Sequence, residues 1–126
     1  MVQSNEEAAQ RYTKATEQGH ARAQFNLGFL YKNGRGVIQD DNEAARLYRL
    51  AAEQGHTRAQ FNLGTLYKNG RGVAQSDKEA AQWYEEAANQ GHAEAQSNLG
   101  LLHEKARGVA QSEKEAARWY MQAVHV

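Results

Sequence analysis

The sequence predicts an all-α fold, a right-handed α-solenoid of antiparallel helix pairs with seven helices. The dipeptide Gly-His recurs at residues 19–20, 55–56 and 91–92, so the repeating unit has 92 − 56 = 36 residues. Within each unit, two stretches carry apolar residues at helical spacing and are separated by a glycine-rich turn. A unit of this size cannot bury a core alone, and the units are therefore expected to stack on one another.

The first predicted helix, residues 4–18, matches the second helix of the later units. Ser4 and Glu7 have the spacing of a capping box, in which a hydroxyl and a carboxylate bond the free amides at a helix start. Arg11 and Thr16 stand where the later units have apolar residues. Such polar replacements are typical of the cap that closes one end of a solenoid.

The first helix of each full unit is clearest in the second unit, over residues 57–69. Its apolar stripe at helical spacing consists of Ala59, Leu63, Leu66 and Tyr67. Gly64 lies beside this stripe and would let another helix approach closely. Gly34 and Gly70 follow the helix in the first two units, where a left-handed residue with positive φ is expected to end it. The third unit has Ala106 at this place, which should cost on the order of 1 kcal/mol.

The second helix of each unit begins with a capping box, formed by Ser76 and Glu79 in the second unit. The same two positions hold Asp40 with Glu43 and Ser112 with Glu115. Mostly small residues follow at helical spacing, which favours close packing of two helices: Ala80, Ala81, Tyr84, Ala87 and Ala88. Gly91 is expected to end this helix with a left-handed residue.

These elements give a single helix followed by three helix pairs, at residues 21–54, 57–90 and 93–125. We interpret the chain as one solenoid domain, residues 1–126. It consists of an N-terminal cap at 4–20 and repeats at 21–56, 57–92 and 93–126.

The repeated residues resemble a known family. The pattern Ala-x-Ala-Gln-x-Asn-Leu-Gly-x-Leu-Tyr-x-x-Gly-x-Gly-Val, followed by Glu-Ala-Ala-x-Trp-Tyr-x-x-Ala-Ala-x-Gln-Gly-His, is similar to the Sel1-like repeat, a relative of the tetratricopeptide repeat. Ile38, Ala74 and Ala110 stand where that family often has proline. The chain has no cysteine, so it does not resemble the members that carry a disulfide in every repeat. The resemblance implies a scaffold that binds a protein or peptide in a concave groove lined by the first helix of each repeat.

Neither the composition nor the sequence motifs indicate a function other than protein binding. Fifteen basic and fifteen acidic residues cancel, which gives no electrostatic case for nucleic acid or an anionic membrane. The absence of cysteine and of a signal-peptide pattern favours a cytoplasmic location. His20, His56 and His92 recur once per unit, and neighbouring helices roughly 8–10 Å apart cannot bring them within the roughly 2 Å of a zinc–nitrogen bond. We therefore expect no enzyme, no cofactor and no metal.

One face of the first helices changes in charge and size between units, and in tetratricopeptide relatives the matching helix lines the groove. The predicted partner-binding residues are Arg22, Phe25, Asn26, Phe29, Lys32, Arg58, Phe61, Asn62, Thr65, Lys68, Glu94, Asn98 and Leu101. The phenylalanines and the leucine would be apolar anchors, and the arginines and lysines a basic half. Alternatively, Phe25 and Phe61 pack between adjacent first helices. The paired arginine and asparagine also resemble a clamp for a peptide carboxylate, although Glu94 stands where the third unit would need a cation.

A second interpretation is a structural, self-associating short repeat array, either natural or consensus-engineered, without a dedicated peptide ligand. The last helix carries an apolar edge that consists of Trp119, Tyr120, Met121, Ala123, Val124 and Val126. An uncovered edge of this kind is typical of an interface. Either a further repeat of a longer array covers this edge or another copy of the chain does, and we expect a weak homodimer through residues 116–126.

Overall fold

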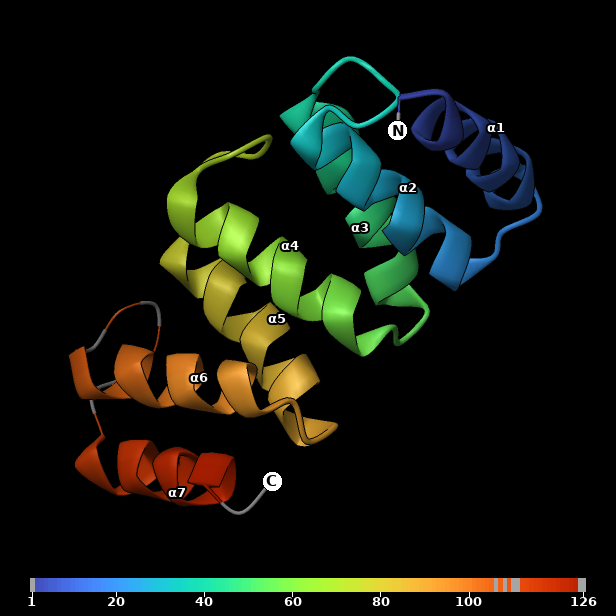
Figure 1. Ribbon diagram of the computed structural model, residues 1–126. Coiled ribbons are helices and arrows are strands. Elements are labelled where there is room, and N and C mark those ends of the chain that lie inside the picture. The colour runs from blue at the N-terminus through green and yellow to red at the C-terminus, as the bar shows by residue number, and fades with distance from the viewer. Residues whose placement is uncertain (1, 106, 108, 110–111, 125–126) are drawn as a thin grey trace.

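The computed structural model describes residues 2–105, 107, 109 and 112–124 of the chain. These residues form seven helices and no strand (Figure 1). The helices are α1 (Val2–Glu17), α2 (Ala21–Asn33), α3 (Asp41–Glu53), α4 (Thr57–Asn69), α5 (Asp77–Asn89), α6 (Ala93–Lys105) and α7 (Glu113–Val124). The predicted fold class, a solenoid of helix pairs, is confirmed.

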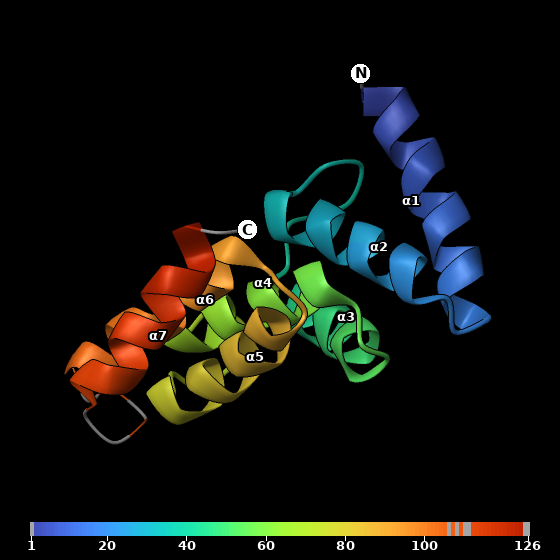
Figure 2. The same ribbon diagram turned by 90° about the horizontal axis from the view of Figure 1, so that it is seen from below.

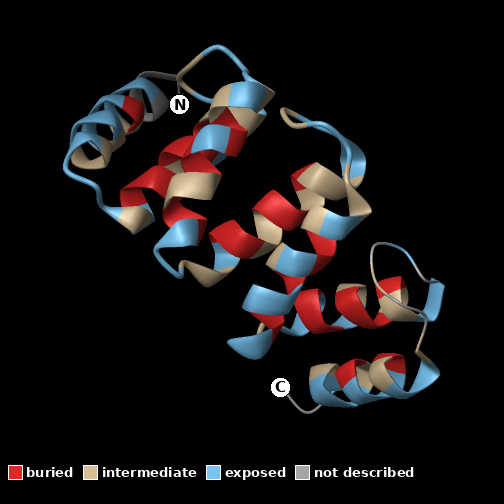
Figure 3. Cartoon of the chain, turned by 180° about the vertical axis from the view of Figure 1, so that it is seen from behind, coloured by how far each residue is buried: buried red, intermediate tan, exposed pale blue. Residues whose placement is uncertain are grey.

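Each helix packs chiefly on its neighbours in the chain. The pairs α2–α3, α4–α5 and α6–α7 form the repeats, and α3 on α4 and α5 on α6 join one repeat to the next. Figure 2 shows α3 and α5 along one side of the array and α2 and α4 along the other. In Figure 3, buried residues follow the paired helices, whereas α1 is mostly exposed and buries only Ala9 among its described side chains.

The helix ends follow the predicted chemistry with one exception. The side chains of Asp40, Ser76 and Ser112 accept hydrogen bonds from the amide three residues later, at 3.0–3.1 Å. Gly34 and Gly70 have φ of 63° and 67°, as predicted. The helix α1 begins at Val2, so the expected capping box at Ser4 is wrong because that residue lies inside the first turn. The prediction for Ala106 falls outside the described residues.

A glycine in the first helix of each repeat contacts a tyrosine ring of the second helix. A Cβ atom added to Gly64 would lie 2.9 Å from the Tyr84 ring, and Gly28 has the same relation to Tyr48. The third repeat brings Gly100 against Tyr120 in the same way. Tyr48 and Tyr84 are fully buried by this contact and by the small residues around them. The expectation that Gly64 allows close helix approach is confirmed.

Buried glutamines join successive repeats through hydrogen bonds to the backbone, and a side-chain bond within the repeat holds Gln60 in place. Gln60 is 3% exposed, and its Nε2 donates to the carbonyl oxygen of Ala52 at 3.1 Å, across the junction between repeats. Its Oε1 accepts from Gln90 at 2.7 Å. Gln96 repeats the first of these bonds with Ala88 at 3.1 Å. A buried amide that is paired in this way fixes the register of one repeat on the next.

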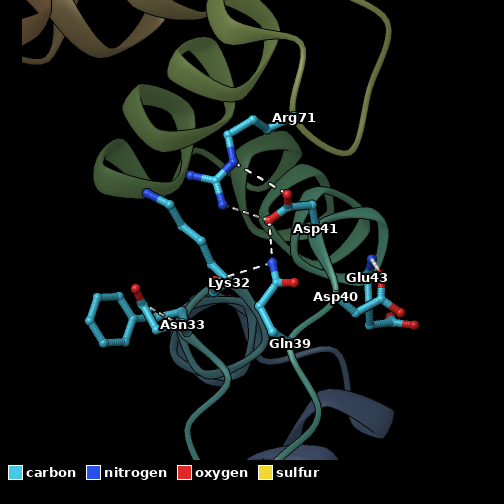
Figure 4. A network of polar contacts seen from close by, with 8 residues as sticks. Lys32, Asn33, Gln39, Asp40, Asp41, Glu43 and Arg71 are labelled. Atoms are coloured by element: carbon cyan, nitrogen blue, oxygen red, sulfur yellow. Dashed lines mark hydrogen bonds and ion pairs between the residues drawn. The ribbon is translucent and has the colours of Figure 1, made fainter.

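In the second and third repeats, the glycine-rich corner docks on the start of the preceding second helix. Arg71 donates two hydrogen bonds to the carboxylate of Asp41, at 3.1 and 3.2 Å, and Gln39 donates to the same carboxylate at 2.6 Å (Figure 4). Arg107 and Asp77 form the same pair at the next junction. These ion pairs are exposed, so each contributes little energy, and they mainly set geometry.

Two glycines of the second corner should respond differently to replacement by alanine. Gly70→Ala places a Cβ 3.1 Å from a side-chain atom of Gln75 and should destabilise by about 1 kcal/mol, chiefly through its positive φ. At Gly72, which also has positive φ, the Cβ would overlap the backbone carbonyl of Asp41. Gly72→Ala should therefore cost roughly 3 kcal/mol, because the corner must move away from α3. Urea unfolding measures both, and equal midpoints for the two variants would contradict this account of the junction.

Candidate partner-binding site

The structure places most of the predicted partner-binding residues on one side of α2, α4 and α6. We call this set the first-helix face: Arg22, Asn26, Phe29, Lys32, Arg58, Asn62, Thr65, Lys68, Glu94, Asn98, Leu101 and Glu104. Arg22, Arg58 and Glu94 are exposed, and the three asparagines are half-buried. Phe29 is 40% exposed, and Leu101 is half-buried at the matching position of the third repeat.

Two of the expected apolar anchors are part of the fold. Phe25 is only 5% exposed, because its ring stacks on His56 at 4.8 Å and packs on Tyr48 at 5.6 Å. Phe61 is half-buried and stacks on His92 at 4.6 Å. These contacts correspond to the alternative in which both rings pack between repeats. Phe25 is therefore not accessible to a partner.

The stacked histidines hold the starts of the next first helices. The Nδ1 atom of His56 accepts a hydrogen bond from the amide of Ala59 at 3.1 Å, and His92 does the same for Ala95. His20 begins α2 without a side-chain capping bond. The capping role of His56 and His92 was not predicted from the sequence. The signal that could have revealed it is the constant spacing between the phenylalanine of one unit and the histidine of the next.

The charges along the first-helix face change sign between repeats. Burial lowers the pKa of His56 below its ordinary value of 6.5, and the positive charges of Arg58 and Arg22 lower it further. Burial also lowers the pKa of His92, but there Glu94 acts in the opposite direction. The guanidinium of Arg58 lies 5.1 Å from the centre of the Phe25 ring, which holds this charge over the junction. The first two repeats therefore present positive charge, and the third presents negative charge.

The half-buried polar residues of this face lie beside the core tyrosines. Burial raises the pKa of Tyr84, and hydrogen bonding to Thr65 and Asn98 opposes that rise. The hydroxyl groups of Thr65 and Tyr84 lie 3.0 Å apart. Burial also raises the pKa of Tyr48, and the nearby Asn62 and Arg58 oppose that rise. In the third repeat, the Tyr120 hydroxyl donates to the Glu104 carboxylate at 2.8 Å. The polar atoms of this face thus stabilise the fold as well as line its surface.

Within the described ranges, no group of three or more histidine, aspartate or glutamate side chains is arranged to hold a metal ion. Among the described helices, none combines the length and the apolar character that crossing a bilayer requires.

A model of the Sel1 repeat matches residues 21–56, 57–92 and 93–124 of the chain. A Sel1 repeat protein from Oxalobacter formigenes is 41% identical, with a TM-score of 0.91, over 95% of this chain and 49% of that one. The protein c5321, a protective antigen present in uropathogenic Escherichia coli strains, displays an SLR fold. It is 37% identical, with a TM-score of 0.89, over 93% of this chain and 25% of that one.

The chain therefore spans between a quarter and a half of the length of these two structures. Helicobacter pylori cysteine rich protein B is 23% identical, with a TM-score of 0.76, over 99% of this chain and 90% of that one. At this identity the likeness shows the fold alone. No relative was found among curated proteins.

The histidine caps predict a loss of stability in mild acid. Because the folded-state pKa values of His56 and His92 lie below 6.5, the unfolded chain binds more protons as the pH falls below that value. Protonation also turns Nδ1 from an acceptor into a donor and breaks the cap, which is worth about 1 kcal/mol per helix. We expect the urea midpoint to be highest above pH 6.5 and to fall as the pH is lowered to about 5.

Asparagine variants test whether the two capping histidines, rather than His20, cause this pH dependence of stability. Replacing His56 and His92 by asparagine, a capping residue that does not titrate, should flatten the pH dependence. His20→Asn should leave it as in the wild type, since His20 does not cap. A double variant that keeps the full pH dependence would show that other groups cause it.

Proposed function

The chain belongs to the Sel1 repeat family, whose members generally act as non-catalytic protein–protein interaction scaffolds, and we propose that it binds a partner protein or peptide on the first-helix face. The face lies on the side that the sequence analysis expects to form a concave groove. The first helices of three successive repeats carry this apolar and charged surface. It suits a partner segment that runs along the array.

The observation that carries this proposal is the contrast between packing positions and surface positions. The glycine, tyrosine and glutamine of the core recur in all three repeats. Equivalent positions of the first-helix face instead differ between repeats. One position holds Phe29, Thr65 and Leu101 in turn, and another holds Arg22, Arg58 and Glu94. Phe29 is a large apolar side chain that remains 40% exposed. Fold stability does not require this variation, whereas recognition of an asymmetric ligand does.

The charge distribution sets the orientation of the ligand. Arg22 and Arg58 both act on His56, so their positive fields overlap at the first junction. Glu94 gives the third repeat the opposite sign. A partner segment would therefore place its acidic end over α2 and α4, and its affinity should fall with added salt. A carboxylate clamp is less well supported, because Glu94 stands where the third repeat would need a cation.

Charge reversal tests the face directly. Peptides selected by display on the folded chain should combine acidic and apolar residues. Arg22→Glu with Arg58→Glu should weaken their binding by about tenfold or more, because attraction becomes repulsion. The matched control, Lys78→Glu with Lys114→Glu, makes the same change in net charge on exposed positions of α5 and α7. Titration by fluorescence anisotropy gives both affinities, and an equal effect of the two pairs would remove the proposal.

A second proposal concerns self-association through α7. Met121 and Val124 are 61% and 78% exposed on this helix, which gives it an apolar outer edge. Trp119, expected as part of that edge, is instead 3% exposed and packs inward against the preceding repeat. The edge is therefore smaller than the sequence suggests, and we propose only a weak dimer through it.

Light scattering checks this second proposal. The weight-average mass should rise with protein concentration in the high micromolar range, and Met121→Lys with Val124→Lys should abolish the rise by placing like charges at the contact. A strictly monomeric wild-type chain at all concentrations would end this interpretation and leave the proposal for the first-helix face intact.

A further inference from the structure

A crevice of about 540 Å³ lies between α3 and α5, the two helices that Figure 2 shows along one side of the array. Its walls come from the end of α3, the turn that follows it, the first turn of α4 and one side of α5: Ala52, Glu53, Gly55, Gln60, Glu79, Gln82, Trp83, Glu85 and Glu86. Trp83 is half-buried and packs against the preceding repeat, so its ring forms a fixed wall. The first-helix face contributes no residue to this crevice.

The corresponding positions in the other two repeats hold an arginine. On α3, Arg46 donates to the carboxylate of Glu43 at 2.6 Å. On α7, Arg118 pairs with Glu115 at 3.0 Å, and its guanidinium also lies 4.7 Å from the centre of the Trp119 ring. The third repeat thus shows that a glutamate and a tryptophan at this spacing hold a guanidinium between them.

The second repeat has the glutamate and the tryptophan but lacks the arginine. Glu79 and Trp83 stand at the positions of Glu115 and Trp119, and Gln82 stands at the position of Arg118. Glu53, Glu85 and Glu86 add negative charge around the same ring. In the part of the chain that the structure describes, none of these four carboxylates forms an ion pair.

We propose that this crevice is a second interaction site, which takes an arginine side chain of a partner protein between Glu79 and the Trp83 ring. Arginine fits better than lysine, because its planar guanidinium stacks on an indole and donates in parallel to a carboxylate. The site is on a different side of the array from the first-helix face, so both can be occupied at once. It goes beyond the proposed function and does not depend on it.

The two tryptophans of the chain provide an internal comparison for the test. N-acetyl-arginine amide is titrated into the ¹⁵N-labelled protein, and the two indole N–H signals are followed by NMR, with Trp83→Phe to assign them. The Trp83 signal should move in a saturable way, and the Trp119 signal should stay in place because Arg118 already covers that ring. The neutral isostere N-acetyl-citrulline amide should give no saturable shift.

Gln82→Arg supplies the matched variant, because it installs in the second repeat the arginine that the other repeats contain. It should abolish the response of Trp83 while leaving the Trp119 signal and the helix content unchanged. Gln10→Arg adds the same charge on the exposed surface of α1 and should leave the response at wild-type strength. Equal shifts of both indoles, an equal effect of the citrulline compound, or a response that persists in Gln82→Arg would each overturn the proposal.

Discussion

The contact between a glycine of the first helix and a tyrosine of the second holds each helix pair together, and the rest of the array depends on it. A Cβ atom at Gly28, Gly64 or Gly100 would lie 2.8–2.9 Å from the tyrosine ring, closer than real side chains approach. The missing side chain therefore lets the ring lie directly on the helix backbone. The alanines beside the tyrosine keep the two helices close along their length. Once the pair is formed, its outer surfaces are fixed in position, and they can support junctions with neighbours.

Each junction repeats the same contacts, and this regularity defines which surfaces are available for binding. Gln60 bonds to the end of α3, His56 caps α4 while stacking on Phe25, and Arg71 pairs with Asp41 at the corner. The glutamine, the histidine and the arginine are identical in all three repeats, and the phenylalanine is shared by the first two. The positions without such a partner are free to differ. The proposed sites lie where the repeats do differ, on the first-helix face and around Trp83.

Much of the fold could be predicted from the sequence, because the signals for helix pairs are local. The capping residue Ser76, the left-handed Gly70 and the apolar stripes each depend on residues within one or two turns. The contacts that join repeats were harder to predict, because some of them, such as Arg71 with Asp41 and Phe25 with His56, link residues about 30 positions apart. Gln60 is a polar residue on the inner side of a helix, and only its bonds to Ala52 and Gln90 explain its burial. Phe25 was assigned to the binding face because helical periodicity places it outside the stripe of its own helix pair. The next repeat covers Phe25, and the periodicity of a single helix cannot show which of its residues a neighbouring repeat covers.

The central claim is that the close approach of each helix pair requires glycine because of the tyrosine ring. A double-mutant cycle of Gly64→Ala and Tyr84→Ala, followed by urea unfolding, tests it most directly. With the ring present, the added methyl group should destabilise the chain. With the ring removed, the same change should stabilise it by up to about 1 kcal/mol, because alanine favours a helix over glycine. If Gly64→Ala has the same effect in both backgrounds, the ring does not set the requirement for glycine and the account is contradicted.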